Sequence, residues 1–169
     1  MLDRVDIEPL FFAPFVSSVM RVEPGWIDHN GHLNMAYHNV LFDRCVDEAY
    51  ELIGIGVDYV SGRNLSAYTA EVHVRYLREL HEGDPVRATL QLIDYDTKRL
   101  HFFEQLFHAD RGDIAATSEN IVLHVDMTAR KTAPFPAEVM HRLMHMKAAH
   151  SRLPRPEAAG RRITMPAKG

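Results

Sequence analysis

Residues 34–54, NMAYHNVLFDRCVDEAYELIG, carry the amphipathic pattern that decides the fold of this chain. Apolar side chains recur at a spacing of four residues, so they share one face of a helix. They are Tyr37, Leu41, Cys45, Ala49 and Ile53, and the opposite face carries Asp43, Arg44, Asp47, Glu48 and Glu51. Asn34 suits the N-cap position, and Gly54 suits the residue just beyond the C-terminus. The stretch therefore predicts an amphipathic helix over residues 36–53 that buries one face.

Beyond this helix, the hydrophobic period changes from four residues to two. Residues 68–76, YTAEVHVRY, alternate apolar and polar side chains, which predicts a half-buried strand. Three further strand-like runs follow, with the turn sequences HEGD, DYDTKR and DRGD before and between them. These runs span residues 86–92, 100–109 and 114–127. We expect the four strands, joined by short connections, to form an antiparallel meander.

The chain before the helix and after the last strand is less regular. Residues 1–13 read as a lead-in segment, and residues 15–22, FVSSVMRV, predict a first strand. Pro24-Gly25 ends that strand, because proline and glycine interrupt regular structure. A short helix is expected after Pro136.

The length of 169 residues suggests one domain, which we predict to span residues 1–149. Residues 150–169 are rich in Pro, Gly and Arg and predict an extended C-terminal tail. The order of strand, long helix and four antiparallel strands indicates an α+β fold in which the helix packs against a curved sheet. The free edge of such a sheet favours pairing with a second copy, so we expect a homodimer or a dimer of dimers.

Composition and charge argue against several classes of protein. The chain is 46% hydrophobic and 25% charged, which is ordinary for a globular protein with a real core. A net charge of −4 without a basic stripe argues against a nucleic-acid partner. No run reaches the roughly 18 apolar residues of a membrane span, and the acidic N-terminus is unlike a signal peptide. Since the single cysteine, Cys45, also excludes a disulfide framework, we expect a cytoplasmic protein with no membrane partner.

The residues just before the predicted helix are unusually polar. Residues 26–38, WIDHNGHLNMAYH, place an acid, three histidines, two asparagines and a glycine after a tryptophan. The N-terminus of a helix offers unpaired N–H groups and the positive end of the helix dipole. Polar side chains gathered there can act on a carbonyl group that the helix end polarises.

The order of elements and this motif resemble the hotdog-fold acyl-CoA thioesterases of the 4-hydroxybenzoyl-CoA thioesterase type. The matching motif residues are Asp28, Gly31, His32, Asn34 and Tyr37, and the resemblance covers roughly residues 15–130. More narrowly, WIDHNGHLN, YTAEVHV and ATSENIVLHVD resemble the thioesterases of carnitine and betaine breakdown. The resemblance implies a hotdog fold, with a long central helix wrapped by a curved antiparallel sheet. It also implies hydrolysis of an acyl-CoA thioester without a metal or other cofactor, in a pocket between subunits.

The resemblance gives the motif residues catalytic roles. Asp28 is the candidate carboxylate, acting either as the nucleophile on the thioester or as the base that activates water. Its alternative role is to cap a turn. Backbone N–H groups near Met35 and Ala36 are the candidates for the oxyanion hole. His32 and Asn34 would orient the loop, the carboxylate or the water, although Asn34 is equally suited to a simple N-cap.

Four further residues are candidates for substrate binding: Trp26, Tyr37, Tyr68 and Glu71. The face of Trp26 could hold a quaternary ammonium acyl group, as in betainyl-CoA, and its alternative place is the core. Tyr68 would line the acyl pocket, with ordinary burial in a strand as the alternative. Glu71 is either a second carboxylate or one half of an ion pair with Arg75.

Two other functions fit the same pattern. One is a hydratase or dehydratase of this fold with His32 as the base, although such enzymes carry Pro and Gly where LNM follows here. The other is an acyl-CoA-binding module without catalysis. The spacing of His29, His32 and His38 also permits a metal site, but no second ligand cluster accompanies it, so we predict none. Candidates for binding the CoA phosphates are Lys98, Arg99, Arg130 and Lys131.

Overall fold

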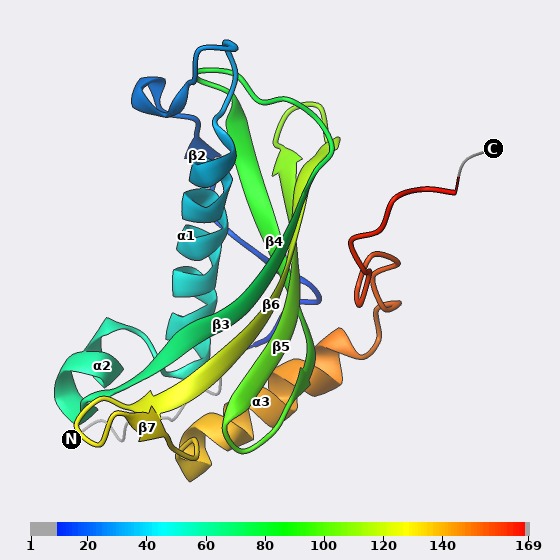
Figure 1. Cartoon of the computed structure of the whole chain (residues 1–169). Helices are drawn as coiled ribbons and strands as arrows, with labels where there is room; N and C mark the ends of the chain where they lie inside the picture. The colour runs from blue at the N-terminus through cyan, green and yellow to red at the C-terminus, as the bar shows by residue number, and fades with distance from the viewer. Residues whose placement is uncertain (1–9, 168–169) are drawn as a thin grey trace.

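A long helix lies across one face of a curved antiparallel sheet in the computed structural model, which describes residues 10–167 (Figure 1). The helices are α1 (Met35–Ile53), α2 (Val57–Arg63) and α3 (Ala137–His150), with a short 3₁₀ turn η1 (Pro24–Trp26). The strands are β1 (Phe15–Val16), β2 (Met20–Arg21), β3 (Leu65–Tyr76), β4 (Pro85–Tyr95), β5 (Arg99–His108), β6 (Ile114–Asp126) and β7 (Lys131–Thr132). The predicted α+β architecture is confirmed. Of the lead-in segment predicted over residues 1–13, residues 1–9 lie outside the described part of the chain.

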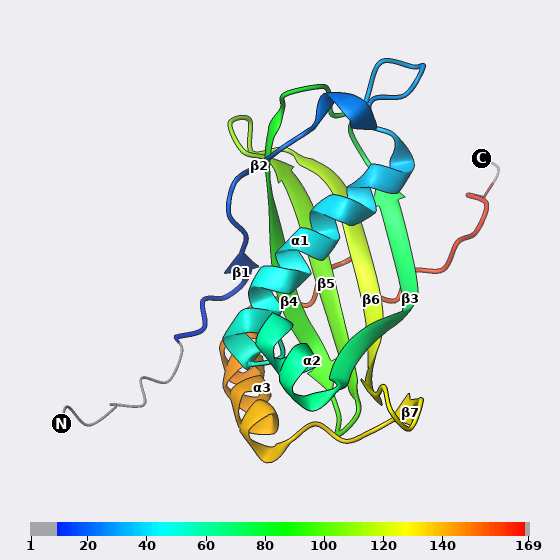
Figure 2. The same ribbon diagram turned by 90° about the vertical axis from the view of Figure 1, so that its left-hand side faces the viewer.

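The predicted amphipathic helix is confirmed as α1, which runs obliquely across the sheet (Figure 2). Its N-cap is Asn34, whose side-chain oxygen accepts a hydrogen bond from the Ala36 N–H at 2.9 Å. Its C-cap is Gly54, which adopts a left-handed conformation with φ of 81° that few other residues tolerate. The predicted apolar face is buried against the sheet at Leu41, Cys45, Ala49 and Ile53.

The sheet has the order β1-β4-β5-β6-β3, and its pairings are antiparallel. β4, β5 and β6 form a meander, but the prediction of four consecutive strands is wrong at β3, which pairs with β6 at the far edge. Three strand spacings, about 14 Å, separate β3 from β4. The connection over residues 77–84 spans this distance easily at about 3.4 Å per residue. It passes the N-terminus of α1, where the Leu33 N–H donates to the Leu80 carbonyl at 2.7 Å.

The strand predicted over residues 15–22 is interrupted. β1 and β2 both pair with β4, but the ladder breaks after Ser17, whose N–H still donates to the Ala88 carbonyl at 2.8 Å. The Ser17 hydroxyl accepts a hydrogen bond from the Ala88 N–H at 3.0 Å and so takes the place of a backbone acceptor. The next residue, Ser18, turns to α1 and donates to Glu48 through both its N–H and its hydroxyl. Competition of side chains with the backbone ladder explains the break.

β3 is an edge strand, and its apolar face is less buried than predicted. Among the described strands it pairs only with β6, with a register shift between Thr69 and Glu71. Val72 and Tyr76 are 42% and 43% exposed, because α1 packs chiefly on β4 and β5. The bulge turns Tyr68, which is 52% exposed, to the opposite face of the sheet, where it pairs with Leu123. A long edge strand with exposed apolar side chains is a surface for pairing with another chain.

Two helices close the end of the sheet that lies far from the motif. α2, which the sequence did not predict, places the Tyr59 hydroxyl 2.7 Å from Nε2 of the buried His124. α3 has 14 residues, so it is longer than the short helix expected after Pro136. Its last residue, His150, accepts a hydrogen bond from the Leu92 N–H and bonds the Phe12 carbonyl with its other ring nitrogen. These bonds fix the end of α3 to the sheet and to the N-terminal segment.

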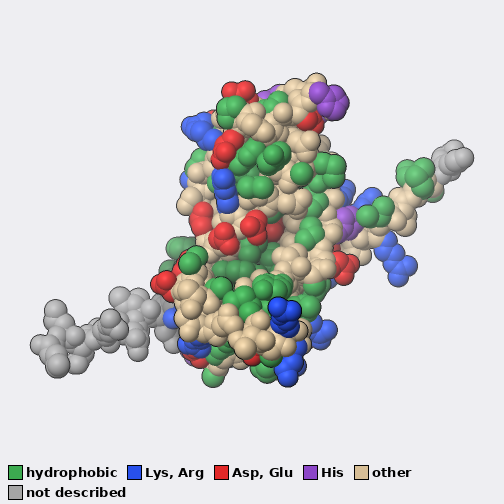
Figure 3. Space-filling view, turned by 60° about the vertical axis from the view of Figure 1, so that its left-hand side comes forward, with side chains coloured by type: hydrophobic (Ala, Val, Ile, Leu, Met, Phe, Trp, Pro, Cys, Tyr) green, Lys and Arg blue, Asp and Glu red, His purple; other side chains and the backbone are tan. Residues whose placement is uncertain are grey.

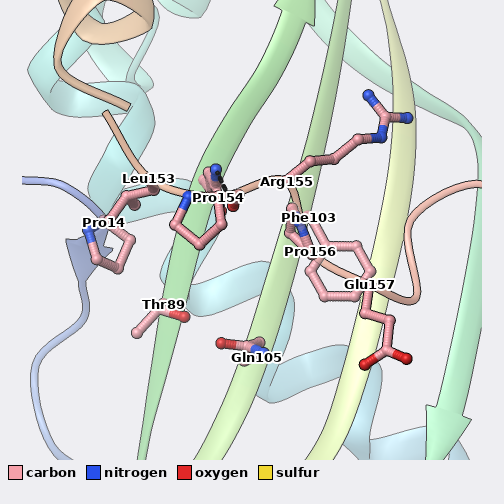
Figure 4. Close-up of a pocket in the computed structure, with 10 residues that line it drawn as sticks. Pro14, Thr89, Phe103, Gln105, Leu153, Pro154, Arg155, Pro156 and Glu157 are labelled. Atoms are coloured by element: carbon pink, nitrogen blue, oxygen red, sulfur yellow. Dashed lines mark hydrogen bonds between the residues drawn. The ribbon is translucent and has the colours of Figure 1, made fainter. Parts of the chain in front are cut away.

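The C-terminal tail lies along the face of the sheet opposite to α1 (Figure 1). The Gly160 N–H donates to both carboxylate oxygens of Glu119, and Gln91 Nε2 donates to the Pro154 carbonyl. A cavity of about 450 Å³ lies between tail and sheet (Figure 4). Its lining is Pro14, Thr89, Gln91, Phe103, Gln105, Leu153, Pro154, Arg155, Pro156 and Glu157. The division into a domain over residues 1–149 and a tail over 150–169 stays a prediction.

Candidate active site

The polar motif before α1 folds as a small hairpin. An isolated bridge pairs Ile27 with Leu33, and the Asp28 N–H donates to the His32 carbonyl at 3.1 Å. The Gly31 N–H donates to the Asp28 carbonyl, and Gly31 has a φ of 85°, which closes a three-residue loop. The Asn34 N–H then bonds the Trp26 carbonyl. The hairpin therefore places Asp28 and His32 side by side at its neck, directly before the helix.

These two side chains line an open cleft at the N-terminus of α1, which we call the motif cleft. Its volume is about 410 Å³. The lining residues are Asp28, His32, Leu33, Met35, His38, Tyr76, Leu77, Arg78 and Glu79. The end of β3 and the following connection form its second wall, and the bond from Leu33 to Leu80 holds that wall against the hairpin. Three of the four predicted catalytic residues, Asp28, His32 and Met35, therefore share one cavity.

Asp28 combines a structural bond with an available oxygen. Its side chain is half-buried, and Oδ1 accepts a hydrogen bond from the Asn30 N–H at 2.8 Å. This is the turn-capping bond of the alternative interpretation, and the structure contains it. Within residues 10–167, Oδ2 has no bonding partner, so it is available to a molecule in the cleft. Capping and catalysis are therefore compatible, because they use different oxygens.

Of the two backbone N–H groups predicted for the oxyanion hole, only that of Met35 is available. The Ala36 N–H is already bonded to the Asn34 side chain, so it cannot serve an external oxyanion without losing the cap. The Met35 N–H has no acceptor within residues 10–167, and Met35 itself lines the cleft. Asn34 is confirmed as an N-cap, and it lies beside the cleft without lining it. The N-terminal dipole of α1 reinforces the Met35 N–H as a donor to developing negative charge.

Two histidines lie in the cleft wall in different environments. His32 is partly exposed, with Nε2 3.5 Å from Oε1 of Glu79. His38 is buried, and burial lowers its pKa below the ordinary value. Its Nδ1 lies 3.2 Å from the Asn34 carbonyl, which can only accept, so Nδ1 carries the proton. The ring of His38 meets Tyr76 edge to face at 4.9 Å, and the Tyr76 hydroxyl donates to the Met35 carbonyl.

Trp26 and Tyr37 lie outside the cleft. Their rings stack with centroids 5.6 Å apart, and Trp26 is only 8% exposed. The guanidinium of Arg44 lies 5.0 Å from the centroid of the Trp26 ring, and it also pairs with Glu23. A cation from the protein itself thus occupies the position at Trp26 that was predicted for a substrate ammonium group. The structure places Trp26 and Tyr37 where the hairpin packs on α1.

Tyr68 and Glu71 also lie away from the cleft of their own chain. Both are exposed on β3, on either side of the bulged Ala70. Tyr76 is the residue of the same strand that reaches the motif cleft. Within this chain, the structure therefore does not bring Tyr68 and Glu71 to the predicted site.

A family profile described as the thioesterase-like superfamily matches residues 22–143. The chain belongs to the thioesterase-like superfamily. The predicted hotdog fold and the assignment as a thioester hydrolase are thereby confirmed.

Two curated relatives and one solved structure are similar to this chain over most of its length. A betainyl-CoA thioesterase of Pseudomonas aeruginosa is 37% identical over 145 residues, which are 86% of this chain and 91% of that protein. An L-carnitine dehydrogenase/betainyl-CoA thioesterase of Rhizobium meliloti is 40% identical over 143 residues, which are 85% of this chain. The chain spans only 29% of that relative's length. A hypothetical protein of Staphylococcus aureus, solved in complex with CoA, superposes with a TM-score of 0.84 at 28% identity, covering 94% of this chain and 99% of that one.

The sequence missed the second wall of this thioesterase-like cleft. Residues 77–79 looked like an ordinary polar connection, and only its long-range contact with the hairpin gives it a place in the site. Arg78 brings a positive charge to the rim, where it pairs with Asp113 at 3.7 Å. Within this chain, the basic residues predicted for the CoA phosphates lie at the other end of the sheet. About ten residues of β6, roughly 33 Å, separate the two ends.

Metal and membrane sites are not apparent in the described part of the chain. Within residues 10–167, no group of three or more His, Cys, Asp or Glu side chains is arranged to hold a metal ion. None of the helices in this range has the length and apolar character that crossing a bilayer requires.

Proposed function

We propose that this chain hydrolyses a short, cationic acyl-CoA thioester of the betainyl type to the free acid and CoA. The observation that carries the proposal is the motif cleft, in which the Asp28 carboxylate and the unengaged Met35 N–H meet at a helix N-terminus. The names of the curated relatives support betainyl as the acyl group, and the CoA-bound relative supports CoA as the thiol. A cytoplasmic location stays a prediction of the sequence.

With Asp28 as the base, a water molecule attacks the carbonyl carbon while Oδ2 takes its proton. Negative charge develops on the carbonyl oxygen, and the Met35 N–H and the α1 dipole stabilise it. The tetrahedral adduct expels the CoA thiolate, which takes the proton from Asp28. The products are the free acid and the CoA thiol, and Asp28 returns to its carboxylate form.

With Asp28 as the nucleophile, its carboxylate attacks the same carbon and expels the CoA thiolate, leaving a mixed anhydride that water cleaves. A single turnover in H₂¹⁸O tests the nucleophilic route. Recovery of ¹⁸O in the Asp28 side chain, measured by peptide mass analysis, assigns that route, with water cleaving the anhydride at the Asp28 carbonyl. Label in the acid product alone excludes cleavage of such an anhydride at the Asp28 carbonyl.

We also propose that the active form is a homodimer, or a dimer of dimers, joined along β3. The free edge of β3 is 12 residues long and carries exposed apolar side chains, which argues for pairing. Light scattering at micromolar concentration should show a dimer or tetramer, and a fully active monomer would contradict this proposal.

Two rivals share the fold. A hydratase or dehydratase would use His32 as its base, and a binding module would hold acyl-CoA without turnover. A screen that follows thiol release and enoyl absorbance across acyl-CoA esters separates all three. We expect thiol release, with betainyl-CoA among the best substrates. Loss of enoyl absorbance would favour the hydratase, and binding without either signal would favour the module.

A further inference from the structure

Glu104 of β5 is a buried acid with an unused oxygen. Its side chain is 1% exposed and faces the side of the sheet that α1 covers, next to Ser118 and Asn120 of β6. Its Oε2 accepts a hydrogen bond from Asn120 Nδ2 at 3.2 Å. Its Oε1 has no hydrogen-bond partner among residues 10–167. Buried polar atoms are almost always bonded, so this oxygen needs an explanation.

The electrostatic surroundings of Glu104 make the missing partner more conspicuous. Burial, and then the charge of Asp43, raise the pKa of Glu104 well above its usual range. No Lys, Arg or His in the described part of the chain forms an ion pair with it. An uncompensated buried carboxylate is strongly unfavourable. A cation supplied from outside the chain would remove this penalty.

Glu104 is one of the residues that line a pocket of about 340 Å³ between α1, β3 and the rest of the sheet, which we call the anionic pocket. The lining includes Asn39 and Asp43 of α1, Val72 of β3, and Ser118 and Asn120 of β6. Its volume falls within the range of about 300–1,000 Å³ that small-molecule sites occupy. The pocket thus combines two carboxyl groups with polar and apolar walls.

Acidic side chains continue along α1 beyond this pocket. Figure 3 shows them gathered in the middle of the face that carries α1. Asp43, Asp47 and Glu51 line the adjoining hollow, where burial and the neighbouring carboxylates raise the pKa of Asp47. The electric field of these acidic side chains therefore attracts cations and repels the phosphates of CoA.

The anionic pocket follows the motif cleft along the same side of α1. Met35 and His38 line the cleft, and Asn39 begins the pocket one helical turn later. The four residues from Met35 to Asn39 rise about 6 Å, so the near end of the pocket lies within reach of a short acyl group. β3 borders both hollows, with Tyr76 at the cleft and Val72 at the pocket. A thioester carbonyl held at the Met35 N–H, with its acyl group directed along α1, would therefore place the acyl end at the mouth of the anionic pocket.

We propose that the anionic pocket binds the quaternary ammonium end of the acyl group, with Glu104 as its buried counter-ion and specificity determinant. This inference rests on the proposed function, because it assigns the acyl end of the same substrate. The CoA moiety then extends away from the acids, past the rim at Arg78. Glu104 binds substrate and takes no part in the proton transfers at Asp28.

A pair of isosteric substrates isolates the charge. In 3,3-dimethylbutanoyl-CoA, a carbon atom replaces the nitrogen of betainyl-CoA, so shape is kept and charge is lost. The wild type should prefer betainyl-CoA by about 10² or more in kcat/KM, the scale of a desolvated charge pair. Glu104→Gln keeps the Asn120 bond and removes the charge, so its preference should fall to within about tenfold. Glu119→Gln, on the opposite face of the sheet, is the matched control and should keep the wild-type preference.

The outcomes separate this inference from the proposed function. If the wild type cleaves both esters equally, or Glu104→Gln slows both alike, the counter-ion role is wrong and the thioesterase assignment stands. If the wild type cleaves neither, the proposed function fails, and thermal melts in tetramethylammonium chloride against equal sodium chloride decide the inference. Stabilisation by tetramethylammonium in the wild type but not in Glu104→Gln supports the pocket, and an equal response in both proteins overturns it.

Discussion

The motif cleft and the anionic pocket lie on the same side of α1 but hold their polar groups differently. In the cleft, Asp28 and His32 are partly exposed, and a local hairpin of hydrogen bonds positions them. In the pocket, Glu104 is fully buried and keeps an unpaired oxygen at a cost to folding. The difference suggests a division of labour, in which the open cleft performs chemistry and the buried acid selects the substrate.

The largest effect should come from Asp28→Asn. Asparagine keeps an oxygen for the Asn30 N–H but cannot serve as a base or nucleophile. Turnover should fall by about 10² or more, and the melting temperature should change little, because a turn cap contributes about 1 kcal/mol.

Asp126→Asn is the matched control for this change. Asp126 makes the same kind of capping bond, to the Thr128 N–H at 2.8 Å, at the far end of the sheet. It should leave thiol release unchanged. Normal turnover by folded Asp28→Asn would remove Asp28 from the chemistry and turn attention to Glu71 and His32.

The pH dependence of kcat/KM should distinguish the anionic pocket from the motif cleft, with a change of up to about tenfold per pH unit. Glu104 must be ionised to hold a cation, and its pKa is raised. The value of kcat/KM for betainyl-CoA should therefore increase as the pH rises through the pKa of Glu104. The ratio to 3,3-dimethylbutanoyl-CoA cancels the pH effects that are common to both esters. The titratable neighbours of Glu104 are Asp43, Cys45 and Tyr50, all on α1, and the flanking strands contribute Leu90, Ser118 and Asn120, which do not titrate. A ratio independent of pH in the wild type would argue against Glu104 as the counter-ion.

A smaller effect is expected on stability without substrate. The pKa of Glu104 is higher in the folded than in the unfolded chain. Its contribution to the free energy of unfolding is therefore complete below about pH 4.3 and is lost as the pH rises. Glu104→Gln should therefore melt a few degrees above the wild type at pH 8, since about 1 kcal/mol corresponds to about 2–4 °C at this chain length. The gap should narrow towards pH 5 in a series of thermal melts. A variant that melts lower at pH 8 would show that the acid stabilises the free protein.

The smallest effect on selectivity should come from Trp26→Phe. Tyr37 and Arg44 already contact the Trp26 ring, so its loss should cost about 1–3 kcal/mol of stability and leave the preference for betainyl-CoA intact. The isosteric pair of esters measures this preference. A tenfold fall in the preference would restore Trp26 as the residue that holds the ammonium group.

The motif cleft was largely predictable because its chemistry is contiguous in sequence. The hairpin, the N-cap and the long helix follow one another within residues 26–54, and local rules govern each of them. The second wall was not predictable, because it depends on β3 crossing to the far edge of the sheet. Periodicity reports which residues form a strand but does not report its neighbours.

The anionic pocket could not be predicted for the same reason. Its residues come from α1, β3, β5 and β6, and no short motif joins them. Glu104 appeared in the sequence as one of several polar residues within the strand LHFFEQLFHA. Only the packed structure shows that it faces the helix with an oxygen unpaired.

The division of labour between cleft and pocket is tested most directly by steady-state thiol release from betainyl-CoA, comparing Asp28→Asn and Glu104→Gln with the wild type. The account predicts that Asp28→Asn lowers kcat by about 10² with KM nearly unchanged, because it removes a group that acts in the transition state. It predicts that Glu104→Gln raises KM by about 10² with kcat closer to the wild-type value, because it removes binding of the acyl group. The same loss of kcat in both variants, with KM unchanged, would contradict the separation of chemistry from recognition along α1.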